Sequence, residues 1–163
     1  MKTQRTKLNL LTEADYEDLL TMFEEPGAFQ YIKHLENKTR EQYKEYLSLK
    51  QQEIASGKGY YWVARNLETS SLIGGVNLTP IPKTNQVQIG WMISSAHRRK
   101  GYAYEVAHKV LEFALKETDF RPIYAVFEKE NVASEKIIKK LNFSFLESKI
   151  VDGIDEERYI YQG

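Results

Sequence analysis

The chain has 163 residues, carries 23 Lys and Arg against 23 Asp and Glu, and contains no Cys. This length suits a single domain over residues 1–163, and a formal net charge of zero argues against a dedicated nucleic-acid binder. The missing thiols exclude disulfides and a Cys nucleophile. The N-terminus lacks the apolar stretch of a secretory signal, and no apolar run could span a bilayer, so we expect a cytoplasmic protein without membrane attachment. No His pair has metal-ligand spacing, and no metal is expected.

Hydrophobic periodicity and turn residues divide the chain into helices and strands. In chain order, the predicted elements are a strand at 7–11, a helix capped by Thr12 and ended by Pro26-Gly27, a helix from Thr39 to Gly57, strands at 60–65, 71–78 and 86–93, a helix at 102–117, a strand at 123–128, a helix at 131–141, and a hairpin of 143–151 with 157–162. The three middle strands indicate an antiparallel meander. The order predicts one α/β domain with no linker.

The most informative stretch joins the strand at 86–93 to the long helix. It carries Arg98, Arg99 and Lys100, and then Gly101 opens the helix. A helix start offers free N–H groups and the positive end of a dipole, which together favour an anion. Gly101 permits close approach of the backbone, and Ala103 keeps the first turn free of bulk, so the pattern suits a pyrophosphate. The alternatives are a solvated basic loop or a nucleic-acid contact through the three cations.

The spacing Arg98-x-x-Gly101-x-Ala103 after a strand resembles the coenzyme A motif of the GCN5-related N-acetyltransferases, the GNAT superfamily. Further similarities follow in the family's element order and resemble its ribosomal-protein serine and alanine N-acetyltransferase branch, at 7–15 (KLNLLTEAD), 89–91 (IGW), 101–105 (GYAYE), 131–134 (NVAS) and 140–143 (KLNF). Asn142 stands where the family usually has Gly, at a site that needs a left-handed backbone, which Asn tolerates.

The resemblance implies an α/β (α+β) fold. This is a single GNAT-like domain with a central mixed, mostly antiparallel sheet, splayed between the strands at 86–93 and 123–128 and flanked by about four helices. Acetyl-CoA, the implied co-substrate, would lie in that wedge, with no metal. The cofactor contacts it implies are backbone groups of Met92 and Ile93 for pantetheine, the basic loop residue Arg98, backbone N–H groups of Arg99, Lys100, Gly101, Tyr102, Ala103 and Tyr104 for pyrophosphate, and Asn131 with Ser134 near the thiol.

Acetyl transfer to an amine requires loss of an amine proton, polarisation of the carbonyl and departure of a thiolate. The main-chain N–H of Ile93 is the implied oxyanion donor. In many members of the family a Tyr at the position of Ile138 acts as the general acid, so Ser134 is the remaining candidate for that role here. The alternative is that the Ser134 hydroxyl only bonds to its own helix. Gln88 stands where many members have a Glu that acts as the general base.

The general base is therefore left open among Glu105, Glu128 and Glu147, acting through water. Glu105 is better explained as a partner of the helix dipole. His97 and His108 are expected to be surface or packing residues. Trp62 and Trp91, which alternate along predicted strands, are expected in the core.

The segments 24–38 and 152–157 are implied to flank the amine entrance. Their acids would favour a cationic acceptor: Glu24, Glu25, Asp152, Asp155, Glu156 and Glu157. The sequence thus predicts an acetyl-CoA-dependent N-acetyltransferase for a primary amine, with a protein N-terminal α-amino group favoured over a small amine. The alternative is a non-catalytic acyl-CoA-binding module or sensor. A monomer or a homodimer is expected.

Overall fold

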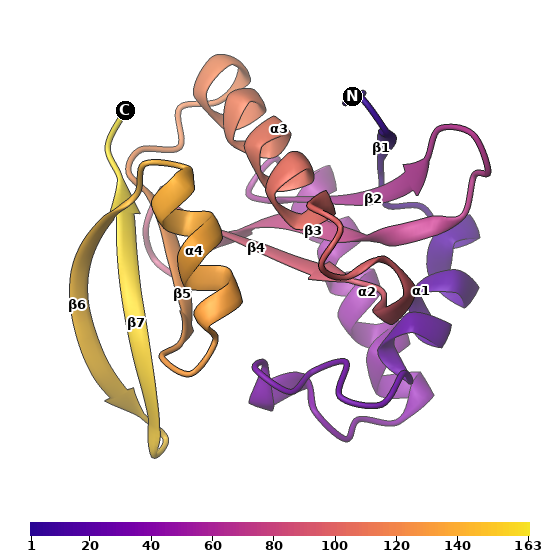
Figure 1. The fold of residues 1–163 in the computed structure, drawn as a ribbon, viewed down its shortest axis with the longest axis horizontal. Coiled ribbons are helices and arrows are strands. Elements are labelled where there is room, and N and C mark those ends of the chain that lie inside the picture. The colour runs from indigo at the N-terminus through magenta and orange to yellow at the C-terminus, as the bar shows by residue number, and fades with distance from the viewer.

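The computed structural model describes residues 1–163 as one seven-stranded sheet with helices on both faces (Figure 1). The strand order is β1-β2-β3-β4-β5-β7-β6. The strands are β1 (Thr6–Leu10), β2 (Tyr60–Asn66), β3 (Leu72–Pro80), β4 (Val87–Ile93), β5 (Ile123–Glu128), β6 (Ser144–Val151) and β7 (Ile154–Tyr161). The helices are α1 (Tyr16–Phe23), α2 (Arg40–Ala55), α3 (Tyr102–Glu117) and α4 (Val132–Lys140), with short 3₁₀ turns η1 (Glu13–Asp15), η2 (Lys33–Leu35) and η3 (Ser95–His97). None of the helices combines the length and the apolar character needed to cross a bilayer.

The sheet opens between β4 and β5, which are its one parallel pair. They pair only at Val87 with Ile123 and at Gln88 with Tyr124. Beyond these residues β4 stays with β3 as far as Ile93, while β5 follows β7 along its full length. Figure 1 shows the two halves of the sheet diverging below this contact. The predicted splayed sheet is confirmed, and the divergence leaves backbone groups of both strands without a neighbouring strand.

Two apolar cores lie on opposite faces of the sheet. Alternation along β2 sends Trp62 to the core under α3, while Tyr61 and Val63 join the core with α1 and α2. Trp62 is buried as predicted, and Trp91 is partly buried against the same core.

Two turn positions show how local sequence shapes the C-terminal half. Asn142 adopts φ +63° directly after α4, as its place in the sequence predicted. Asp152 and Gly153 have φ +50° and +80°, the pattern of a two-residue hairpin turn. This tight turn starts β7 at Ile154, so the predicted strand start at 157 is wrong by three residues.

Candidate active site

The loop before α3 presents a row of free backbone donors. No N–H from Arg98 to Tyr104 donates to an acceptor in the protein, and the first helical bond runs from Glu105 N to Gly101 O at 3.2 Å. Arg99 and Gly101 both have left-handed backbones, with φ +60° and +81°. Alternating backbone conformations of this kind turn successive N–H groups toward a common point. The loop therefore offers an anion site of the kind that the predicted pyrophosphate contact requires.

The basic side chains of this loop mainly hold the loop itself. Arg98 Nε donates to Ile93 O at 3.1 Å, and Lys100 Nζ donates to Ala96 O at 2.7 Å. Arg99 has no such bond. Two of the three cations are thus engaged in local structure, which leaves little of a free basic patch for nucleic acid, although their charge still favours an anion at the loop.

A contact between the segment before β1 and the start of α3 supports this loop, and sequence reasoning missed it. Arg5 Nη1 donates to Lys100 O at 3.0 Å, its guanidinium lies 4.1 Å from the Tyr102 ring centre, and its Nη2 lies 2.7 Å from Glu105 Oε2. Glu105 also accepts hydrogen bonds from Thr3 and from the Arg5 backbone. Burial raises the pKa of the Glu105 carboxyl, but these hydrogen bonds outweigh it and lower that pKa overall. Glu105 is held by hydrogen bonds and an ion pair from the N-terminal residues, which agrees with the structural role expected for it.

The end of β4 turns one residue's backbone toward the opening. Ser94 N donates to Ile73 O at 2.9 Å, and backbone direction alternates along an antiparallel ladder. The N–H and C=O of Met92 therefore point to its β3 partner Gly75, whereas those of Ile93 point away from β3. The expectation that Met92 offers its backbone to pantetheine needs this correction: Met92 contributes its side chain to the cavity described below.

The start of α4 places Asn131 and Ser134 together, and neither residue lines the cavity described below. Asn131 Oδ1 caps the helix by accepting from Ser134 N at 3.1 Å. The Ser134 hydroxyl makes no hydrogen bond within the chain, so the alternative in which its own helix binds it is not what the structure has. Ile138, at the place of the family's Tyr, is fully buried in the core.

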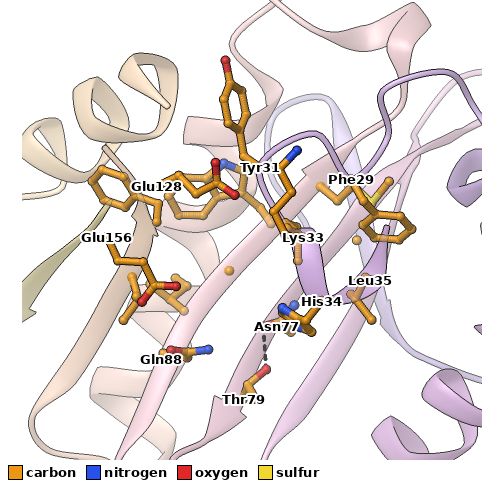
Figure 2. Close-up of a pocket in the computed structure, with 18 of the residues that line it drawn as sticks. Phe29, Tyr31, Lys33, His34, Leu35, Asn77, Thr79, Gln88, Glu128 and Glu156 are labelled. Atoms are coloured by element: carbon orange, nitrogen blue, oxygen red, sulfur yellow. Dashed lines mark hydrogen bonds between the residues drawn. The ribbon is translucent and has the colours of Figure 1, made fainter. Parts of the chain in front are cut away.

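A cavity of about 600 Å³ lies over β3 and β4, mainly on the side of the sheet that faces α1 and α2. It also reaches Trp91 and Phe127, which belong to the core on the α3 side. Figure 2 shows Phe29 to Leu35 on one side of it and Glu128 with Glu156 on the other. The two segments expected to flank an amine entrance therefore both line it. Its lining includes Phe29, Tyr31, Lys33, His34, Tyr46, Lys50, Tyr61, Gly75, Asn77, Thr79, Gln88, Gly90, Trp91, Met92, Phe127, Glu128, Asp152 and Glu156.

The closed end of the cavity is polar and already hydrogen-bonded. Lys50 is buried, donates to Glu53 at 3.0 Å and to Thr79 Oγ1 at 3.3 Å, and Thr79 in turn donates to Asn77 Oδ1 at 2.9 Å. A Cβ at Gly90 would lie 3.1 Å from Asn77 Oδ1. The missing side chain at Gly90 therefore keeps the floor of the cavity open.

Only two of the six predicted loop acids line the cavity, Asp152 and Glu156. The other four have local partners: Glu24 pairs with Arg40, Glu25 accepts from Ser95 N, Asp155 pairs with Lys129, and Glu157 accepts from the Tyr159 hydroxyl. Sequence patterns gave no sign of these partners. Glu128 joins Asp152 and Glu156, so three carboxylates without an ion pair line the cavity.

The candidate general bases likewise divide into those that have partners elsewhere and one that lines the cavity. Glu147 lies on β6 in ion pairs with Arg158 and Lys149, and the hydrogen bonds from these cations lower its pKa. Of the three predicted candidates, Glu128 alone lines the cavity.

Among the histidines, His34 alone lines the cavity. Burial lowers the pKa of its imidazole, with the charge of Glu156 opposing that shift. The neutral ring can therefore accept a proton at pH 7. His97 instead bonds Ser94 Oγ through Nδ1 at 2.7 Å and contacts the Tyr102 ring, a packing role as expected. The structure contains no cluster of three or more acidic or His side chains that could hold a metal ion.

A sheet opened beside its parallel strand pair, a helix start with free N–H groups and a cavity at the opening are the features expected of a GNAT acetyltransferase. The chain belongs to the GNAT family: residues 5–144 match the Acetyltransferase (GNAT) domain. It is accordingly an N-acetyltransferase of a family that uses acetyl-CoA.

Comparison with known proteins agrees with this assignment. The chain is 28% identical over 147 residues to the uncharacterized N-acetyltransferase YoaA of Bacillus subtilis, covering 88% of this chain and 81% of YoaA. The ribosomal L7/L12 α-N-protein acetyltransferase RimL, solved with coenzyme A, has a TM-score of 0.86 at 13% identity, covering 98% of this chain and 95% of RimL. Spermidine N-acetyltransferase from Vibrio cholerae, solved with CoA and spermine, has a TM-score of 0.82 at 17% identity, covering 96% and 95%. At these identities the two structures show a shared fold.

Proposed function

We propose that this enzyme transfers the acetyl group of acetyl-CoA to a primary amine that enters the cavity as a cation. The observation that carries the proposal is the set of three carboxylates, Glu128, Asp152 and Glu156, which line one cavity without an ion pair. Unpaired anions around a small cavity attract an ammonium group and raise its local concentration. The opposite wall supplies Lys33, but that cation pairs with Glu36.

Acetyl-CoA would bind at the opening between β4 and β5, next to the loop that precedes α3. The free N–H groups between Arg98 and Tyr104 would bind the pyrophosphate. The backbone of Ile93 would face the thioester, with its N–H as the donor to the developing oxyanion. The Ser134 hydroxyl, which has no partner in the protein, would protonate or stabilise the departing thiolate. A thiol has an ordinary pKa of about 8.5, so this help is useful rather than essential.

The acceptor nitrogen must lose a proton before it attacks. Glu128 and the neutral imidazole of His34 are the two groups of the cavity that could take it, directly or through water. Gln88 lies in the same cavity but has no basic atom at neutral pH. A pH profile of kcat/KM in Glu128→Gln and His34→Gln variants separates the two.

Two acceptor classes are carried forward. The motif resemblance favours the α-amino group of a protein N-terminus. A cavity of about 600 Å³ falls within the size range of small-molecule sites and, with its unpaired acids, supports a small polycationic amine as the second candidate.

The test is the release of free CoA from acetyl-CoA, measured over a panel of acceptors. The panel pairs small diamines and polyamines with peptides whose N-terminus is free or blocked. We expect release with free amines and none with the blocked peptides, and the better class identifies the acceptor. Binding of acetyl-CoA with no release for any amine would contradict the proposal and favour the non-catalytic acyl-CoA-binding module.

A further inference from the structure

Tyr61 carries a hydroxyl that is buried against the sheet and has no partner in the protein. The residue is 3% exposed, and its Oη makes no hydrogen bond within the chain. Every polar side-chain atom that is sealed from solvent does have a partner, so Tyr61 Oη must reach an open surface. Tyr61 lines the cavity, which supplies that surface. A buried phenol that has no protein partner and faces a cavity can form its hydrogen bond with a ligand bound there.

Gly75 fixes where this hydroxyl lies. A Cβ at Gly75 would lie 2.2 Å from Tyr61 Oη and 2.7 Å from Tyr61 Cζ, so the phenol rests directly on the Gly75 backbone. Gly75 pairs with Met92 in the ladder between β3 and β4, and Ile93 follows Met92. The hydroxyl therefore lies at the floor of the cavity, beside the end of β4 where the sheet opens.

The phenol stays protonated at neutral pH. Burial raises the pKa of Tyr61 well above its ordinary value, and the nearby Tyr46 phenol adds to that shift. A neutral phenol can accept a hydrogen bond through its oxygen and donate one through its proton. Its oxygen can therefore accept a hydrogen bond from a neutral amine while the lone pair of the nitrogen stays free to attack.

We propose that the Tyr61 hydroxyl binds the acceptor nitrogen and aims its lone pair at the acetyl carbonyl. One N–H of the amine donates to Tyr61 Oη, and the lone pair of the nitrogen faces the end of β4. The nitrogen then bonds to the carbonyl carbon, the carbon–sulfur bond breaks with its electrons on sulfur, and the proton lost from nitrogen passes to a cavity base or water. This inference rests on the proposed function and names the part of the cavity that orients its acceptor.

The side of the sheet on which Tyr61 lies selects the nitrogen over the thioester oxygen as its partner. Tyr61 belongs to the face with α1, α2 and the three unpaired carboxylates. The Ile93 backbone, which faces the opening, is the donor available to the carbonyl oxygen. The two contacts hold the reacting atoms from opposite sides, an orienting effect that accelerates transfer.

The test compares Tyr61→Phe with Tyr60→Phe, the same chemical change on the preceding residue. Tyr60 faces the other core, where its ring stacks on Trp62 at 5.2 Å. For the best amine of the panel, we expect kcat/KM to fall about 10- to 100-fold in Tyr61→Phe, mainly through kcat, and to stay at the wild-type value in Tyr60→Phe. Acetyl-CoA affinity by isothermal titration, and the melting temperature, should change little in either variant.

A second variant displaces the hydroxyl instead of removing it, and its melting temperature reports any loss of fold. The methyl group of Gly75→Ala would displace the Tyr61 phenol from the Gly75 backbone while the hydroxyl is kept. We therefore expect a comparable loss of kcat/KM with acetyl-CoA binding retained. Wild-type kcat/KM in Tyr61→Phe would overturn the assignment of Tyr61 while leaving the proposed function intact. Absence of turnover with any amine in the wild-type protein would overturn both.

Discussion

The left-handed backbone at Gly101 predicts a matched pair of substitutions with different consequences. Gly101 has φ +81°, and a Cβ there would meet only Arg5 Nη2, at 3.5 Å. Gly57, after α2, has φ +67° with nothing within 4 Å of such a Cβ. Alanine at either position therefore meets backbone strain rather than a clash, and the strain costs about 1–2 kcal/mol. Gly57→Ala should lose stability by about this amount, and Gly101→Ala should lose less, by the part of the strain that its loop relieves.

Only Gly101→Ala should weaken acetyl-CoA binding. If the loop relieves the strain by rotating its N–H groups away, the ligand must restore the strained conformation on binding. A cost of about 1–2 kcal/mol corresponds to a rise in Kd of about 5- to 30-fold. Urea unfolding followed by tryptophan fluorescence measures the first effect, and isothermal titration of acetyl-CoA measures the second. Equal affinities of Gly101→Ala and Gly57→Ala, with a smaller loss of stability in Gly101→Ala, would refute the reasoning.

Three other predictions follow from the site. Glu105→Gln should reduce the free energy of unfolding by about 1–2 kcal/mol at pH 7, because charged hydrogen bonds with the partly exposed Arg5 become neutral ones. The pKa of Glu105 is lowered in the folded protein, so its contribution exists above the ordinary carboxyl pKa and is lost as the pH falls through the lowered value. The free energies of unfolding of the wild-type protein and Glu105→Gln, measured by urea titration, should converge at acidic pH. A difference between them that does not change with pH would contradict this role of the Glu105 charge. Gly90→Ala should raise KM for the acceptor with acetyl-CoA affinity unchanged, because the new methyl group lies 3.1 Å from Asn77 Oδ1; an unaltered KM would mean that the acceptor does not reach the floor. Glu156→Gln should raise KM for a cationic acceptor at low salt, and high salt should remove most of the difference, since exposed charges are screened; a salt-independent difference would speak against attraction by charge.

Local sequence predicted most of the elements, and the family resemblance predicted the opening of the sheet. The loop from Arg98 to Ala103 combined a family motif with Gly at the one position that needs a left-handed start to the helix. The position of Asn142 likewise depended only on its own backbone and its neighbours. The strand start at Ile154 was missed because a two-residue turn with positive φ is compatible with many longer hairpin loops.

The parts that sequence reasoning missed depend on contacts between distant segments. Arg5 and Glu105 are 100 residues apart in the sequence, and no spacing rule connects them. The contact of the Tyr61 phenol with the Gly75 backbone depends on the register between β2 and β3, which determines the residues that share one face of the sheet. Sequence could not separate the loop acids that line the cavity from those that do not, because a carboxylate's partner decides whether its charge is available to a substrate.

The most direct test of the account is a crystal structure of the protein with desulfo-CoA and the best amine of the panel. The account predicts the pyrophosphate on the N–H groups between Arg98 and Tyr104, the pantetheine arm between β4 and β5, and the amine nitrogen beside Tyr61 Oη in the cavity. Coenzyme outside the opening of the sheet, or an amine bound away from this cavity, would contradict it.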